Sequence, residues 1–213
     1  MGEIGLDYHR NLSPPDTQRA AFSRQLALAA EHGLPVLVHD RAAHADVTEA
    51  LLAWSAAGDG RRGVLHAFSG DRPMAEALVD AGFLISFALP VAFRSADGPR
   101  EAAAALPLGA FLVETDSPYL GPSRERTNEP TTVLRVTAEL ARLRSTEPAE
   151  LVVSIRGAYD ALLRDRHRTA RHHAETPVHG EPSASAGWVG YVIGALGALV
   201  TLGLIVYLLV LAP

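Results

Sequence analysis

The stretch Phe111-Leu112-Val113-Glu114-Thr115-Asp116-Ser117-Pro118-Tyr119-Leu120 decides the fold that we expect. Its three apolar residues predict a short buried strand, two carboxylates follow that strand, and Pro118 turns the chain into a loop. Parallel α/β sheets bind ligands at the carboxyl ends of their strands, so we expect Asp116 to face a site. Taken alone, the stretch has an alternative interpretation as an acidic turn that only caps the next element.

The same arrangement recurs upstream, and this repetition favours the site. Apolar runs end in metal-type ligands at Val36-Leu37-Val38-His39 and at Val64-Leu65-His66, and Met1-Gly2 leads into Glu3-Ile4-Gly5-Leu6-Asp7. We therefore predict three strand ends that deliver ligands and a fourth strand that carries Glu3.

Helical patterns separate these strands and predict a parallel sheet. We expect helices between Ser13 and Gly33 and at about residues 42–57, 73–81, 99–105, 130–143 and 148–163, and further strands near 63–66 and 83–87. A closed (β/α)8 barrel needs eight βα units and about 250 residues. The chain should therefore hold only the last five units of such a barrel.

Composition limits the chemistry that such a chain can carry. Its 213 residues are 48% hydrophobic, which is enough for a sizeable core. Without cysteine the chain has no disulfide and no thiolate zinc site, so a metal must be held by His, Asp or Glu. A formal net charge of -5 argues against a protein that coats nucleic acid through bulk electrostatics. No signal peptide opens the sequence, which predicts a cytoplasmic domain.

Three residues are the strongest metal-ligand candidates besides Asp116. His39 and His66 each follow a β-rich apolar run, where an imidazole points over the mouth of a barrel. Glu3 lies on a strand between glycines, where a buried carboxylate is costly unless it is paired or bound to a metal. On spacing alone Asp7 is an equal candidate, although it lies in the following loop.

Other polar residues have simpler interpretations. We expect structural roles for His9, His32 and His44, and we interpret Asn128 before Pro130 as a helix cap. Loop arginines near the same barrel face are candidates for binding substrate phosphates, with solvated surface charges as the alternative. These arginines are Arg94, Arg100, Arg124 and Arg126.

Taken together, the motifs resemble those of the TatD family of metal-dependent hydrolases, from Met1 to about Leu163. The matching segments are Gly2-Glu3-Ile4-Gly5-Leu6-Asp7-Tyr8, Val38-His39-Asp40-Arg41, His66-Ala67-Phe68-Ser69-Gly70, Glu114 to Leu120, and Arg126-Thr127-Asn128-Glu129-Pro130. The resemblance implies an amidohydrolase-like TIM barrel with two divalent metal ions, Mg, Mn or Zn, that hydrolyses phosphodiesters, commonly as a deoxyribonuclease acting on DNA.

The resemblance also implies roles for individual residues. Glu3 corresponds to a catalytic carboxylate shared by both metals, His39 and His66 to ligands of one metal, and Asp116 to a ligand that also orients the attacking water. Family members open with a strand bearing His-x-His, which holds the other metal, and this sequence has no such motif. We therefore expect an N-terminally truncated barrel with weak activity, or a non-catalytic remnant that anchors to a membrane or binds a partner.

The C-terminal part departs from the family in composition. We expect a partial hydrolase barrel over residues 1–168, a flexible linker over 169–187 and a transmembrane helix over 188–211. About 24 uncharged residues are long enough to span a bilayer, although a buried core helix is the alternative. Arginines precede the span and none follows it, which predicts a single-pass protein of the cell membrane with its hydrolase domain in the cytoplasm.

Overall fold

The computed structural model describes residues 1–123 and 126–174, and side chains only as far as residue 163 in the last helix. Its centre is a five-stranded sheet in the order β1-β2-β3-β4-β5, with every neighbouring pair parallel. The strands are β1 (Ile4–Asp7), β2 (Val36–Arg41), β3 (Gly63–Leu65), β4 (Phe83–Phe87) and β5 (Phe111–Val113). Strands that pair in chain order form a continuous arc, as staves of a barrel do.

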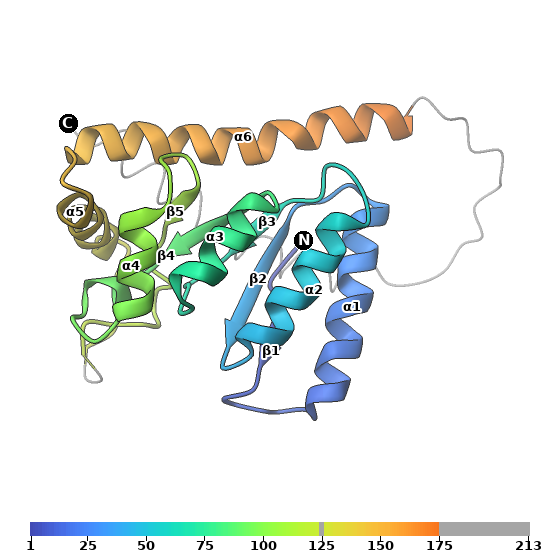
Figure 1. Ribbon diagram of the computed structural model, residues 1–213, viewed down its shortest axis with the longest axis horizontal. Helices are drawn as coiled ribbons and strands as arrows, with labels where there is room; N and C mark the ends of the chain where they lie inside the picture. The colour runs from blue at the N-terminus through green and yellow to red at the C-terminus, as the bar shows by residue number, and fades with distance from the viewer. Residues whose placement is uncertain (124–125, 175–213) are drawn as a thin grey trace.

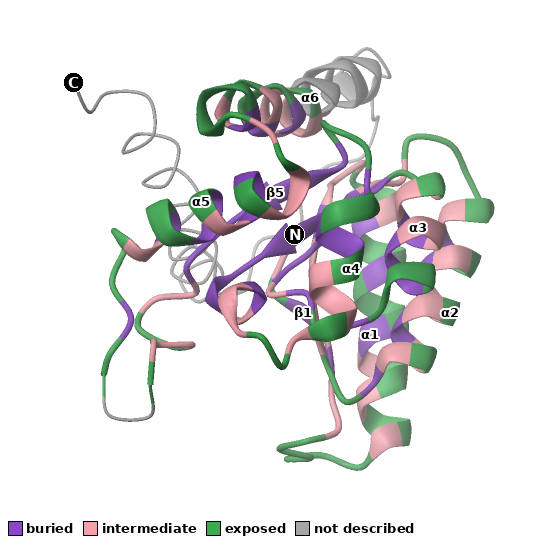
Figure 2. Ribbon diagram, turned by 60° about the vertical axis from the view of Figure 1, so that its left-hand side comes forward, coloured by how far each residue is buried: buried purple, intermediate pink, exposed green. Residues whose placement is uncertain are grey.

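Helices connect and cover these strands (Figure 1). They are α1 (Pro15–Glu31), α2 (His44–Ala56), α3 (Arg72–Asp80), α4 (Asp97–Ala105), α5 (Thr132–Arg144) and α6 (Pro148–Ala174), with a short 3-10 helix η1 (Leu89–Ala92) after β4. The alternation of strand and helix that the apolar patterns predicted is confirmed. In Figure 2 the buried residues concentrate on the strands and on the inner faces of the helices.

Burial follows the predicted periodicities. Helix α2 buries Val47, Leu51 and Trp54, which recur at helical spacing and pack on the sheet. The three residues of β3, a central strand, are all buried, and so are the three of β5, which ends the sheet and contacts α5 and α6. Asp71 caps α3 by accepting a hydrogen bond of 3.0 Å from the backbone N–H of Met74.

Three boundaries differ from those we expected. Strand β1 begins at Ile4, so Glu3 immediately precedes it. Helix α5 begins at Thr132 because the three residues before it form tighter turns with bonds between residues three apart. Helix α6 continues to Ala174, so the first six residues of the predicted linker 169–187 are helical. No glycine or proline interrupts the chain between Gly157 and Pro177, and alanine and arginine favour a helix there.

The predicted membrane span at 188–211 lies outside the described residues. Within the part of the chain that the structure describes, no helix is both long and apolar enough to cross a membrane.

Candidate metal site and substrate cleft

Three ligand-type side chains converge on one point. His39 Nδ1 lies 2.9 Å from Glu3 Oε1, and His66 Nε2 lies 2.8 Å from the same oxygen. The two imidazole nitrogens are 3.2 Å apart. Three of the four predicted ligands therefore meet in one cluster, with one ligand atom of each within 4.8 Å of the others.

Close pairing of β1 with β2 builds this cluster. Gly5 lies opposite His39 in the parallel register, and a Cβ atom on Gly5 would lie only 2.0 Å from the His39 carbonyl oxygen. Gly5 also has a φ of 138°, a backbone conformation that favours glycine. His66 directly follows β3, and its N–H donates to the Val38 carbonyl over 3.0 Å. Glu3, which we expected on the first strand, instead lies directly before that strand and enters the cluster from its amino-terminal end.

Charges within the cluster stabilise one another. Hydrogen bonds from His39 and His66 lower the pKa of the Glu3 carboxyl well below its usual range, against the opposing effect of burial. Burial alone would lower the pKa of His66, but the carboxylates of Glu114 and Glu3 outweigh it and raise that pKa to about 10. Without a metal, the cluster therefore holds a proton on His66, which a divalent cation would replace.

Two further carboxylates support the histidines: Asp7, which spacing alone had made an equal candidate to Glu3, and Glu114, which was not among the predicted ligands. Glu114 is buried, accepts a hydrogen bond from the Ala67 N–H, and has Oε1 3.8 Å from His66 Nδ1. Asp7 Oδ2 lies 3.5 Å from His39 Nε2. Carboxylates behind metal-binding histidines fix the orientation of the rings and make them better ligands. The sequence signal for both was a carboxylate at the carboxyl end of a strand: Asp7 is the last residue of β1, and Glu114 directly follows β5.

Asp116 lies near the cluster but is not part of it. It adopts a left-handed conformation with a φ of 59°, and together with His39 and His66 it lines the same cleft. Burial raises the pKa of its carboxyl, and the neighbouring Glu114 adds to this effect while His66 opposes it. Asp116 is thus a half-buried carboxyl that faces the space beside the other three residues.

The loop that carries Asp116 is clamped by Asn128. Asn128 is 3% exposed, and its Nδ2 donates to the carbonyl oxygens of Thr115, at 2.5 Å, and of Tyr119, at 2.7 Å. Its backbone N–H donates to the Pro118 carbonyl over 3.2 Å. The helix starts four residues later, so the predicted helix-cap role of Asn128 is wrong. Its carboxamide instead holds both sides of the loop around Asp116.

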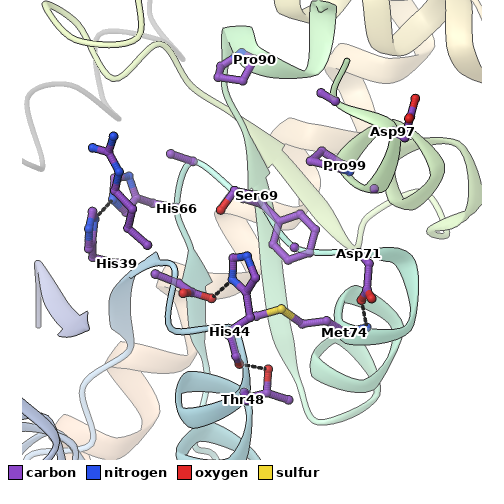
Figure 3. Close-up of a pocket in the computed structure, with 18 of the residues that line it drawn as sticks. His39, His44, Thr48, His66, Ser69, Asp71, Met74, Pro90, Asp97 and Pro99 are labelled. Atoms are coloured by element: carbon purple, nitrogen blue, oxygen red, sulfur yellow. Dashed lines mark hydrogen bonds and ion pairs between the residues drawn. The ribbon is translucent and has the colours of Figure 1, made fainter. Parts of the chain in front are cut away.

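A cleft of about 1110 Å³ opens beside the cluster (Figure 3). Its walls come from the segments that follow β2, β3 and β4, and from the Asp116 loop. Figure 3 shows His39 and His66 together on one side of the cleft, with Pro90, Asp97 and Pro99 on another. The cleft places the cluster within reach of an elongated ligand.

None of the predicted phosphate-binding arginines that the structure describes lines this cleft. Arg100 donates to Glu139 Oε1 over 2.7 Å and to the Val91 carbonyl over 3.0 Å, which is a structural role. Arg126 lines a separate hollow beside the start of α5, and Arg94 is not among the residues that line the cleft. Arg124 lies outside the described residues. Among the described residues, Arg41, which follows His39 by two residues, is the arginine that lines the cleft.

The donor atoms of the cluster fit a divalent cation. Two imidazole nitrogens and one carboxylate oxygen suit ions such as Zn²⁺ and Mn²⁺. Their convergence at hydrogen-bond distances also means that little rearrangement is needed to surround an ion.

A family model and related sequences match this chain over the same region, and they agree on the family. Residues 1–164 match the family model described as TatD related DNase. The chain is 39% identical over 146 residues to the uncharacterized metal-dependent hydrolase YabD of Bacillus subtilis, covering 68% of this chain and 56% of that protein. It is 40% identical over 154 residues to a protein of Klebsiella pneumoniae named 3'-5' ssDNA/RNA exonuclease TatD, covering 69% and 58%.

Solved structures agree with the fold. The crystal structure of YjjV, a TatD homologue from Escherichia coli, superposes with a TM-score of 0.66 at 31% identity, covering 76% of this chain and 62% of that one. A TatD-family hydrolase from Entamoeba histolytica gives a TM-score of 0.65 at 20% identity, covering 76% and 62%, and supports the fold alone. These matches confirm the TIM-barrel-type α/β fold. The chain spans 56% and 58% of the length of the two curated relatives named above.

Proposed function

The chain belongs to the TatD family of DNase-related proteins, and from this membership we propose that it is a metal-dependent hydrolase of phosphodiester bonds in nucleic acid. The observation that carries the proposal is the convergence of Glu3, His39 and His66 at the edge of a cleft that Asp116 also lines. We propose DNA as the substrate, in single-stranded form because the Klebsiella relative is named for that activity.

The proposed metal ligands are Glu3, His39 and His66, with Asp116 as a further candidate. A divalent cation bound there would lower the pKa of water and offset negative charge on phosphate oxygens. His66 is held in place from behind by Glu114, and His39 by Asp7, so both rings are oriented before a ligand arrives.

Asp116 is the proposed proton acceptor. It faces the cleft, and burial raises the pKa of its carboxyl, which makes it a stronger base than an exposed aspartate. A carboxylate in this position can hydrogen-bond to a water molecule and orient it towards a phosphodiester. The clamp by Asn128 keeps this carboxyl in one place, since the loop backbone is fixed on both sides of it.

A cleavage assay tests the proposal. We expect the purified protein to degrade single-stranded DNA in the presence of Mn²⁺ and to stop when the metal is chelated. Asp116→Asn should lower kcat by about a hundredfold or more, because it removes the proton acceptor while keeping the shape. His32→Gln, at the end of α1 and outside the cleft, is the control and should not change the rate. Wild-type turnover that survives in Asp116→Asn would contradict the role given to Asp116.

A further inference from the structure

A histidine–aspartate pair, His44 and Asp40, lines the cleft outside the metal cluster. His44 Nδ1 lies 2.8 Å from Asp40 Oδ2, and the side chain of Asp40 is only 7% exposed. The other oxygen of Asp40 accepts a hydrogen bond of 3.3 Å from the Ala43 N–H. An ionised carboxylate can only accept hydrogen bonds, so Nδ1 of His44 carries the proton between them. The remaining ring nitrogen, Nε2, is therefore the one available to a ligand.

His44 is positioned to use that nitrogen in the cleft. Its side chain is 43% exposed, and it begins helix α2, where its carbonyl oxygen accepts the Thr48 hydroxyl over 2.6 Å. In Figure 3 the ring points into the cleft, towards Ser69 and on the side of His39 and His66, with its contact to Asp40 dashed. The structural role that the sequence suggested for His44 does not account for an imidazole that is presented to open space.

The charged residues that line the cleft indicate which group of a ligand His44 could bind. The acidic residues that line it are Asp40, Glu49, Asp71, Asp97 and Asp116, and the basic ones are Arg41, His39, His44 and His66. Two of these histidines are engaged with Glu3 in the metal cluster. A polyanion entering the cleft therefore meets mainly carboxylates, apart from Arg41 and His44. A histidine that donates from Nδ1 to Asp40 can also donate from Nε2 to a phosphate oxygen in its doubly protonated form, in which both ring nitrogens carry a hydrogen.

We propose that His44, oriented by Asp40, is a substrate-binding residue that donates a hydrogen bond to a phosphate of the nucleic-acid strand beside the metal cluster. This inference rests on the proposed function for its substrate class. Because His44 is not part of the Glu3 cluster, it acts on substrate affinity and leaves metal binding unchanged. Asp40 is a positioning residue, since it acts through the His44 ring.

The test measures binding separately from turnover. Fluorescence anisotropy of a fluorescein-labelled oligothymidylate of eight nucleotides gives the Kd in Ca²⁺, and the cleavage assay in Mn²⁺ gives KM and kcat. His44→Gln should raise both Kd and KM about tenfold, as expected for the loss of one charge-assisted hydrogen bond. Its kcat should be nearly unchanged. Oligonucleotide binding by this variant should also depend less on salt, with the slope of the logarithm of the binding constant against the logarithm of the salt concentration reduced by about 0.7. Mn²⁺ affinity, measured by calorimetry, should stay as in the wild type.

Two further variants separate phosphate binding from other roles. His44→Arg places a permanently charged guanidinium at this position, which can donate to a phosphate but cannot transfer a proton at neutral pH. This variant should retain the affinity for the oligonucleotide within about threefold. A proton-transfer role would instead make His44→Arg lose kcat, and that result would overturn the proposal. His32→Gln, a histidine substitution outside the cleft, should match the wild type in every measurement.

Failure of this inference can be told apart from failure of the proposed function. Turnover by the wild type with unchanged Kd and KM in His44→Gln would overturn the role of His44 and leave the hydrolase function intact. Oligonucleotide binding that depends on His44, without any metal-dependent turnover, would support the binding role and contradict the hydrolase function. A wild type that neither binds nor cleaves the oligonucleotide would contradict both.

Discussion

Asn128 shows how one residue can control a site without touching its ligand. Its carboxamide bridges two carbonyl oxygens on either side of Asp116, in a place that is almost fully buried. Asp116 itself has a left-handed backbone conformation, which a non-glycine residue keeps only when its surroundings hold it there. The position of the Asp116 carboxyl therefore depends on a residue twelve positions along the chain.

Substitution of Asn128 should affect catalysis more than metal binding. Asn128→Ala removes the hydrogen-bond donor to the buried Thr115 carbonyl and to the partly buried Tyr119 carbonyl, and we expect it to lower the free energy of unfolding by about 1–3 kcal/mol and to lower kcat. Mn²⁺ affinity at the Glu3 cluster should change little, because that cluster does not include this loop. Urea unfolding, calorimetry and the cleavage assay measure the three effects. Thr131→Ala, an exposed substitution nearby, is the control, and equal loss of kcat in both variants would contradict the clamp.

At the scale of the elements, Glu139 links two helices through arginines. Glu139 on α5 lies 2.7 Å from Arg100 on α4 and also 2.7 Å from Arg142, one turn further along its own helix. The hydrogen bond from Arg142 and that from Arg100 outweigh burial and lower the pKa of Glu139 from 4.5 to about 2. Because this pKa is lower in the folded state, the ion pairs stabilise the fold above pH 4.5 and lose that effect as the pH falls towards about 2.

Glu139→Gln should remove this contribution. We expect the free energy of unfolding at pH 7 to fall by about 1 kcal/mol, a modest value because solvent screens the exposed Arg142. The difference between variant and wild type should shrink as the pH is lowered from 4.5 to 3, because folding of the wild type must then release the proton that Glu139 carries in the unfolded chain. Urea unfolding across this pH range measures it. A difference that stays constant with pH would show that the ion pairs do not stabilise the fold.

Comparison of elements shows what the sequence could predict. The strands were predictable because each is a short apolar run between helical patterns, and the helices because apolar residues recur at helical spacing, as Val47, Leu51 and Trp54 do in α2. His39, His66 and Glu3 were predictable because each lies at or beside a strand of the same sheet. Spacing along the chain predicts neighbours within an element, and the parallel pairing of successive strands, which the alternation with helices predicts, brings the three ligands together.

Roles that depend on loops could not be predicted in the same way. Asn128 was interpreted as a cap because Pro130 follows it, yet its partners are on the far side of the loop that includes Tyr119. No local pattern fixes how such a loop folds back. For His44 a signal was present, since Asp40 lies four residues earlier, a spacing that brings side chains together at a helix start. The pair could be recognised as part of a site only once the structure showed that both residues line the cleft.

At the scale of the whole molecule, the C-terminal region carries a separate prediction. Residues 188–211 form a long uncharged stretch and lie outside the described part of the structure. We expect the full chain to stay in the membrane fraction after an alkaline carbonate wash, and a version ending at residue 187 to become soluble. Extraction of the full chain by carbonate would contradict a membrane span.

The central claim for the molecule is that its parallel sheet brings Glu3, His39 and His66 together to hold a divalent cation. Titration of the purified protein with Mn²⁺ in an isothermal calorimeter tests this claim most directly. The account predicts binding by the wild type and by His32→Ala, and none by the double variant His39→Ala/His66→Ala with unchanged circular dichroism. The double variant loses both nitrogen ligands and keeps a single carboxylate, which binds a divalent ion much more weakly. Unchanged stoichiometry and affinity in the double variant would contradict it.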